Sequence, residues 1–317
     1  MLSDATHYVP PAASLWQGRA DTLPFERYFQ HIMLIDLNTQ SLNDLEPSTV
    51  IIGFCSDEGI RRNLGRAGAK GGPDALRAQL AKLPRHQHHP LIDVGNIICD
   101  DGNLEAAQEA LRLLVASIHQ KGHKTWVLGG GHEVAYPHYM GLMPYHPNCG
   151  IVNFDAHFDL RPLTKPNVGT SGTPFTQIAN DCKSLNAPFN YCCLGIQPLG
   201  NTASLFEQAH HLNVKYLSAE AIHTQNLSTQ YAFLDDFLKN LDYIYVTLCL
   251  DVLAECYAPG VSAPSPLGLS PIQVNSLLQY LRQTGKVIGM DVAELSPPLD
   301  ERQKTARLAA HMISQWD

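Results

Sequence analysis

The stretch "GIVNFDAHFDLR" at residues 150–161 joins a short apolar run to an alternating series of acids and a histidine. Short apolar runs bounded by turn residues are typical of buried strands in a parallel sheet. Further runs of this kind occur at 48–55, 91–98, 124–131, 191–197, 213–219, 244–252 and 286–295. Segments with helical periodicity separate several of them, such as residues 103–122, which Gly122 is expected to end. This alternation predicts an α/β fold, with helices on both faces of a mostly parallel sheet.

The chain is expected to form one domain that spans residues 1–317. No internal repeat, low-complexity tract or linker rich in proline, glycine and serine divides it. Residues 1–47 precede the first predicted strand, and we expect this N-terminal extension to pack on the surface.

Charge and hydropathy narrow the class of partner. The formal net charge is -8 and the basic residues are scattered, which argues against a nucleic-acid partner. The N-terminus lacks a basic start followed by an apolar run, and no window approaches the roughly 18 apolar residues of a membrane span. We therefore expect a cytoplasmic protein with a small-molecule partner and no membrane association.

The acids and histidine at the end of the 150–157 run and just beyond it are the strongest chemical signal. In an extended chain, Asp155, His157 and Asp159 point to the same side. Carboxylates together with an imidazole suit manganese, iron or zinc. A polar strand end with capping acids is the alternative, and the three donors on one side favour metal binding. "LGGGHE" ends the preceding strand, where His132 would supply another nitrogen ligand.

Two later strand ends carry further acids. Asp251 lies in the otherwise apolar "LCLDV", where burial of an unpaired carboxylate would be costly, and Cys249 faces the same side. "GMDVAELSPPLD" presents Asp291 and Glu294. For Asp291, contact with a cationic substrate group and capping of a loop remain equally open.

Together, "GGGHE", "NFDAHFDLR", "LDVLAECYAPGVSAPSPLGL" and "DVAELSPPLD" resemble the ureohydrolase family of arginases and agmatinases, most of all its formimidoylglutamase branch. The resemblance implies a three-layer α/β/α fold with an eight-stranded parallel sheet and a centre of two manganese ions. It implies one ion at His132, Asp155, Asp159 and residue 249, and the other at Asp155, His157, residue 249 and Asp251. Possible homo-oligomers are also implied by the family.

Position 249 departs from this family pattern, because the family has an aspartate there and this chain has Cys249. Sulfur is a softer donor with longer bonds than oxygen, and it favours zinc or iron over manganese. Zinc, iron or a single metal ion therefore remain alternatives to two manganese ions.

The resemblance also implies the reaction, which is hydrolysis of the linear amidine N-formimidoyl-L-glutamate to L-glutamate and formamide in histidine degradation. Two substrate carboxylates need cationic partners, for which Arg161 is the first choice and Arg62 the second. Ser171, in "TSGTPF", is a further candidate for substrate binding. Asp159 and Glu294 are the candidate catalytic acids, and Glu294 matches the family acid that contacts the amidine-like group.

Two other functions remain open. A guanidino hydrolase of the arginase or agmatinase type is disfavoured, because Phe175 occupies the place of the family histidine that helps proton transfer. A degenerate family member that binds a metabolite or partner without turnover is motivated by Cys249.

Overall fold

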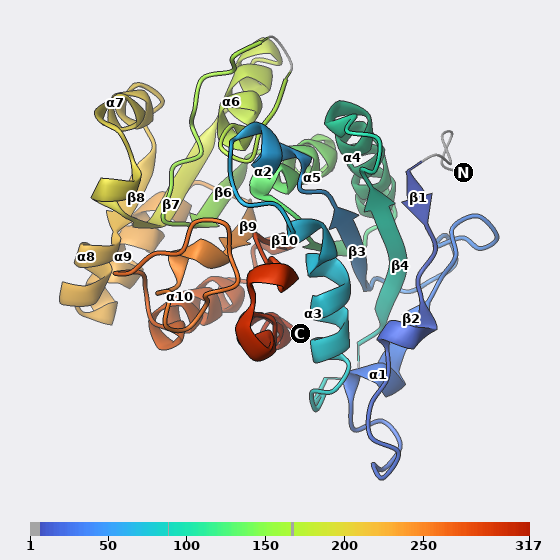
Figure 1. Cartoon of the computed structure of the whole chain (residues 1–317). Coiled ribbons are helices and arrows are strands. Elements are labelled where there is room, and N and C mark those ends of the chain that lie inside the picture. Colours follow the sequence, from blue (N-terminus) through green and yellow to red (C-terminus); the bar gives the residue numbers. More distant parts are fainter. Residues whose placement is uncertain (1–6, 88, 166–167) are drawn as a thin grey trace.

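The computed structural model describes residues 7–87, 89–165 and 168–317, and one β-sheet runs through this part of the chain (Figure 1). Its main path has the order β1-β4-β3-β5-β10-β9-β6-β7-β8, and β2 pairs with β4 beside it. All the strands predicted from the apolar runs are present, and they pair with one another in parallel. They are β3 (Thr49–Cys55), β4 (Leu91–Ile98), β5 (Lys124–Leu128), β6 (Cys149–Phe154), β7 (Asn190–Ile196), β8 (Lys215–Ser218), β9 (Tyr243–Cys249) and β10 (Val287–Ala293).

The N-terminal extension supplies two strands that the sequence analysis did not predict, so the sheet has 10 strands where eight were expected. Both β1 (Tyr8–Val9) and β2 (Ile32–Leu34) pair with β4, the first antiparallel and the second parallel. They are too short to show a periodic pattern, and pairing with β4 defines them. The extension is also anchored by Trp16, whose Nε1 donates to Asp93 Oδ2 at 2.7 Å.

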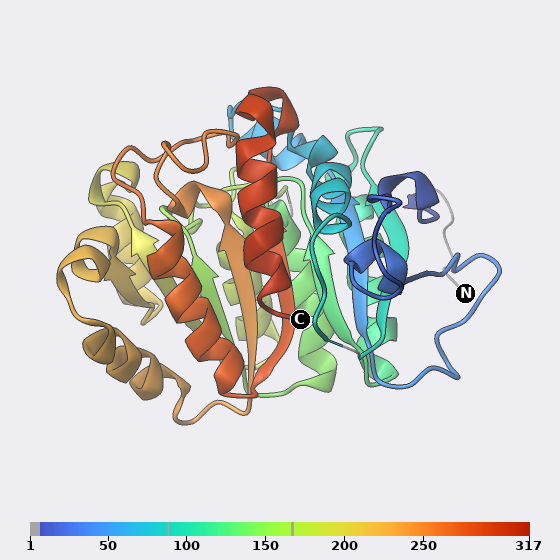
Figure 2. The same cartoon turned by 90° about the horizontal axis from the view of Figure 1, so that it is seen from below.

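Helices cover both faces of the sheet and give the three-layer α/β/α architecture (Figure 2). One hydrophobic cluster holds side chains of α3 (Gly72–Leu80), α8 (Ala219–Thr224), α9 (Leu227–Leu238), α10 (Pro271–Gln283) and α11 (Lys304–Ser314). The other holds those of α4 (Leu104–Gln120), α5 (Ala135–Leu142), α6 (Pro174–Ser184) and α7 (Ala203–His211). Along β3, Ile51 enters the first cluster while Val50 and Ile52 enter the second, as the pleat of a doubly covered strand requires.

The short helices α1 (Tyr28–His31) and α2 (Glu58–Arg62) belong to connecting segments. Helix α4 confirms the helix expected at 103–122. The side chain of Asn103 caps it by accepting from the Ala106 amide, and Gly122 follows its end with a φ of +79°. Among the described residues, no helix combines the length and apolar character that a membrane crossing requires.

The strand order explains where a site can form. In the sheet, β10 lies between β5 and β9, and β6 lies on the other side of β9. These four neighbours are parallel, so their carboxyl ends open at one edge, where ligand sites of such sheets form.

Candidate metal centre and substrate cavity

Six of the predicted site residues meet at the carboxyl ends of β5, β6 and β9. His132 begins the short helix η3 (His132–Val134) after β5, and Asp155, His157 and Asp159 follow β6. Cys249 is the last residue of β9, and Asp251 lies in the single turn η6 (Leu250–Val252) that follows. Residues about 100 positions apart in the chain are thus brought together by strand neighbourhood.

The histidines lie against the carboxylates. His132 Nδ1 is 2.9 Å from both Asp155 Oδ2 and Asp159 Oδ2. His157 Nδ1 is 3.1 Å from Asp251 Oδ2 and 3.4 Å from Asp155 Oδ1. Asp155 therefore lies between the two imidazoles, with one oxygen facing each.

Potential ligand atoms form two groups, each with all its atoms within 4.8 Å of one another. The first is His132, Asp155 and Cys249, and the second is Asp155, His157 and Asp251. Asp155 belongs to both groups, as a ligand that bridges two ions would. Asp159 lies beside the first group through His132, whereas Cys249 belongs to the first group and not to the second.

Burial and the charges of neighbouring groups shift the pKa values of the acids and of Cys249 in this cluster. Burial, helped by the charge of Asp155, raises the pKa of Asp159 to about 6. Burial also raises the pKa of the Cys249 thiol, and the nearby Asp155 and Asp251 carboxylates add to the shift. For Asp155, burial opposes ionisation, but hydrogen bonds from His132 and His157 hold its pKa well below its usual value. The cluster is thus short of positive charge.

These residues fit divalent metal ions. Carboxylate oxygens, imidazole nitrogens and a sulfur are the donors that manganese, iron and zinc take, and two such ions need a shared acid. Two divalent cations would also supply the positive charge that the buried acids lack.

Two acids of this site have strained backbones. Asp159 and Glu294 both adopt left-handed conformations, with φ values of 48° and 72°. Such conformations are costly for residues other than glycine and persist where the surroundings impose them. Glu294 is held by its own amide, which donates to Gly130 O at 2.8 Å, and its Oε1 accepts from the His132 amide at 3.0 Å. Its carboxylate is thereby fixed beside the metal-type cluster, by which we mean His132, Asp155, His157, Asp159, Cys249 and Asp251.

A cavity of about 350 Å³ opens above the cluster. Its wall contains Arg161, Ser171 and Glu294, which are three of the candidate substrate-binding residues. Arg66 and Asn63 also line it, and the sequence analysis missed both. Asn63 Nδ2 donates to Ser171 Oγ at 3.2 Å, which ties two loops of the wall together. The segment "RRNLGR" contains three arginines, and its sequence does not tell which of them faces the cavity.

Arg62 was the second predicted cation, and the structure places it elsewhere. It does not line the cavity but pairs with Glu58 at 2.8 Å and with Glu105 at 2.5 Å. It also donates to Gly169 O at 3.2 Å. Arg62 therefore braces α2 against α4 and the loop at Gly169, which leaves Arg161 and Arg66 as the cavity's arginines.

Asp291 takes neither of the roles left open for it. It is buried within β10, where it accepts hydrogen bonds from Thr247 Oγ1 at 2.5 Å, from Tyr245 OH and from His138. Phe175 is fully buried and lies edge-on to His132, with ring centroids 5.5 Å apart. An apolar ring thus stands next to the cluster at the position where the family resemblance expects a histidine.

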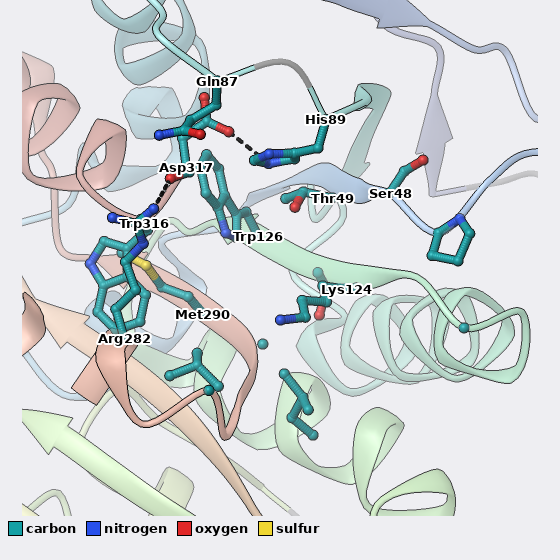
Figure 3. A pocket seen from close by; sticks show the side chains of 17 residues that line it. Ser48, Thr49, Gln87, His89, Lys124, Trp126, Arg282, Met290, Trp316 and Asp317 are labelled. Carbon is teal, nitrogen blue, oxygen red and sulfur yellow. Dashed lines mark hydrogen bonds and ion pairs between the residues drawn. The ribbon is translucent and has the colours of Figure 1, made fainter. Parts of the chain in front are cut away.

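A larger cavity, of about 420 Å³, lies at the opposite edge of the sheet and is lined by Trp126, Lys124 and Asp317 among others (Figure 3). The carboxylate that lines this cavity belongs to Asp317. Its Oδ1 lies 2.8 Å from His89 Nε2, and its Oδ2 lies 2.5 Å from Arg85 Nε. Because its acid is already paired and it contains neither group of ligand atoms, we place the functional site in the smaller cavity.

Comparisons with known proteins agree with this geometry. A model described as "Arginase family" matches residues 47–316. A formimidoylglutamase of Legionella pneumophila (strain Lens) is 55% identical over 315 residues, which are 99% of this chain and 98% of that protein. A formimidoylglutamase of Geobacillus thermodenitrificans is 44% identical, over 96% and 94% of the two chains. Trypanosoma cruzi formiminoglutamase, solved with Mn²⁺, is 28% identical with a TM-score of 0.77, over 87% of this chain and 95% of that one.

Proposed function

Because this chain belongs to the arginase family, to which residues 47–316 match, we propose that it hydrolyses N-formimidoyl-L-glutamate to L-glutamate and formamide. The relatives named formimidoylglutamase align over nearly the full length of the chain, at up to 55% identity. The observation that carries the proposal is structural: two groups of ligand atoms share Asp155 at the base of a cavity that two arginines line. A shared fold alone would not carry it, since function resides in the site.

We propose two divalent ions at this centre, with manganese as the first candidate because the Trypanosoma cruzi relative was solved with Mn²⁺. His132, Asp155 and Cys249, with Asp159 beside them, would hold one ion, and Asp155, His157 and Asp251 the other. Bound ions of this kind lower the pKa of water and polarise the bond that water attacks.

The cavity suits a dicarboxylate that carries an amidine. Guanidinium groups of Arg161 and Arg66 can bind carboxylates bidentately, and Ser171 and Asn63 offer further hydrogen bonds. The Glu294 carboxyl at the base is positioned to accept N–H groups of the amidine. The substrate would thus be held at both ends, with its reactive carbon over the cluster.

Asp159 is the acid that we assign to proton handling. Its side chain is 14% exposed to the cavity, whereas that of Asp155 is fully buried. The carbon–nitrogen cleavage releases the amino group of glutamate, which takes up a proton as it leaves, and an accessible carboxyl can pass that proton. Phe175 leaves no histidine at the family's proton-transfer position, which disfavours a guanidino hydrolase.

One preparation tests the proposal. Metal-depleted protein is supplied with manganese, zinc or iron, and glutamate formation from N-formimidoyl-L-glutamate is measured. Agmatine and L-arginine are the comparison substrates, with urea as their product. Turnover of the formimidoyl substrate alone is expected. If folded protein releases no glutamate with any of the metals, the chain is a non-catalytic family member, the alternative that Cys249 motivates.

A further inference from the structure

A chain of buried polar side chains leads from His132 into the core between the sheet and helices α4 and α5. Its members are Thr247 on β9, Asp291 on β10, Thr125 on β5, His138 on α5 and His119 on α4. None of them is more than 5% exposed. Burial of this many polar groups in an apolar layer is costly unless each is hydrogen-bonded, so the chain calls for an explanation.

Each link is a hydrogen bond. His132 Nε2 lies 2.9 Å from Thr247 Oγ1, which in turn donates to Asp291 Oδ1 at 2.5 Å. On the other oxygen of Asp291, His138 Nδ1 donates at 2.8 Å. His138 Nε2 is 2.7 Å from Thr125 Oγ1, which is 2.9 Å from His119 Nε2.

The register of the sheet builds this chain. Asp291 is the register partner of Thr247 on β9, and Gly289, two residues earlier, is the partner of Thr125 on β5. These positions share one face of the sheet, the face that α4 and α5 cover. A Cβ on Gly289 would lie only 3.2 Å from both His138 Nε2 and Thr125 Oγ1, so the glycine leaves room for their hydrogen bond.

Hydrogen accounting fixes the state of His132. A carboxylate only accepts, so the Thr247 hydroxyl must spend its one hydrogen on Asp291. The Thr247 oxygen then accepts from His132, which must carry a hydrogen on Nε2. The other nitrogen, Nδ1, is the one that lies 2.9 Å from Asp155 and Asp159. Without an ion, Nδ1 donates its hydrogen to these carboxylates. Because Nε2 is already committed to Thr247, an ion that displaces the Nδ1 hydrogen would meet the lone pair of that nitrogen.

The same accounting runs through His138. Its Nδ1 carries the hydrogen donated to Asp291, so in the neutral ring Nε2 accepts from the Thr125 hydroxyl. The Thr125 oxygen then accepts from His119 Nε2. Donors on both sides of Asp291 thus point toward this one carboxylate.

We propose that Asp291 and His138 are positioning residues of the metal centre. His138 holds the Asp291 carboxylate in place, and Asp291 acts through Thr247 to fix the ring orientation and tautomer of His132. Partners of this kind typically change metal affinity by about 10- to 100-fold when they are removed. The inference rests on the metal centre proposed above and extends it to residues that touch neither ion nor substrate.

Two substitutions of His138 separate its two hydrogen bonds. The amide of His138→Asn can occupy the place of Nδ1 and still donate to Asp291, whereas that of His138→Gln reaches the place of Nε2 and Thr125. Calorimetric titration of metal-depleted protein with Mn²⁺ is expected to give near wild-type affinity for His138→Asn. For His138→Gln, we expect about 10-fold weaker binding of one ion. Equal affinities of the two variants, whether both normal or both weakened, would overturn the proposal.

A matched control is another buried histidine, one that does not belong to this series of hydrogen-bonded side chains. His123 is 2% exposed and accepts from the Ser48 amide at 3.1 Å. His123→Gln is expected to lower the melting temperature without changing Mn²⁺ affinity. If the His138 variants do not fold, Thr247→Ser and Thr247→Val provide the same comparison. Serine retains the hydroxyl that links Asp291 to His132 and valine does not, so only Thr247→Val is expected to weaken Mn²⁺ binding. If wild-type protein binds no Mn²⁺ the metal proposal fails, whereas unchanged affinity in the variants rejects only the positioning role.

Discussion

At the scale of single residues, Cys249 is the departure that matters most. It ends β9 with its sulfur among the ligand atoms of His132 and Asp155, and it is only 1% exposed. Burial and the surrounding acids raise the pKa of its thiol, so a bound cation is needed to favour the thiolate. The side chain thus has the position of a ligand and the softness of sulfur.

Replacing this sulfur by a carboxylate tests its role as a ligand. Cys249→Asp is expected to increase the manganese retained per chain after dialysis, because manganese prefers oxygen to sulfur. Metal content by atomic emission is the measurement. Cys256→Asp is the matched control, since Cys256 is an exposed cysteine outside the cluster. Unchanged manganese in Cys249→Asp would make Cys249 a packing residue.

Arg161 permits a test of substrate recognition. Hydrogen bonds to charged groups contribute about 1.5–3 kcal/mol, so Arg161→Met is expected to raise KM for N-formimidoyl-L-glutamate by about 10-fold or more. Arg307→Met removes an arginine from the exposed side of α11 and is expected to leave KM unchanged. Steady-state glutamate formation measures both. A wild-type KM in Arg161→Met would show that Arg161 does not bind a substrate carboxylate, and Arg66 would then be the remaining candidate.

At the scale of elements, the attachment of α3 and the N-terminal extension to β4 depends on one buried ion pair. Arg77 of α3 is 1% exposed and donates to both carboxylate oxygens of Asp93, at 2.8 and 2.9 Å. Asp93 also accepts from Trp16 of the extension. Three segments distant in sequence therefore share one carboxylate.

Removal of the cation should destabilise this junction. Arg77→Met would leave Asp93 buried without its counter-ion, which typically costs about 3–5 kcal/mol in the free energy of unfolding. Urea-induced unfolding measures the loss. In the double variant with Asp93→Leu the charge itself is gone, and much of the stability should return. A single variant as stable as the wild type would show that water reaches Asp93.

At the scale of the whole molecule, buried histidines make stability depend on pH. Burial, with repulsion from His138 and His146, lowers the pKa of His119 from 6.5 to about 3. Between pH 6.5 and about 3, His119 is protonated in the unfolded chain and neutral in the folded protein. The contribution of His119 is therefore complete above pH 6.5 and is lost as the pH falls toward 3.

This linkage predicts a difference between two proteins. In His119→Gln, the free energy of unfolding should fall less steeply from pH 6.5 to 4.5 than in the wild type, by up to about 1.4 kcal/mol per pH unit. Urea titrations across that range measure the slope. His210→Gln, at an exposed position of α7, is the control and should keep the wild-type slope. Parallel curves for His119→Gln and wild type would mean that His119 protonates in the folded state.

The sequence by itself indicated the eight main strands, the layered architecture and a group of possible metal ligands at Asp155, His157 and Asp159. The resemblance to a known family implied the full set of six ligands. Apolar runs and alternating acids are local patterns, so they can be recognised without knowledge of strand order. The order of β5, β10, β9 and β6 is what brings their carboxyl ends together. The departure at Cys249 was equally visible in one short motif.

Only the tertiary structure decided features that depend on partners far along the chain. Arg66 lines the cavity and Arg62 does not, because Arg62 forms an ion pair with Glu105, with 2.5 Å between Nη1 and Oε1. The two N-terminal strands exist because β4 offers them an edge. Asp291 became an internal acceptor because β10 lies beside β9 and under His138. Local periodicity specifies which residues are buried, whereas strand order and side-chain pairing decide what each buried polar group contacts.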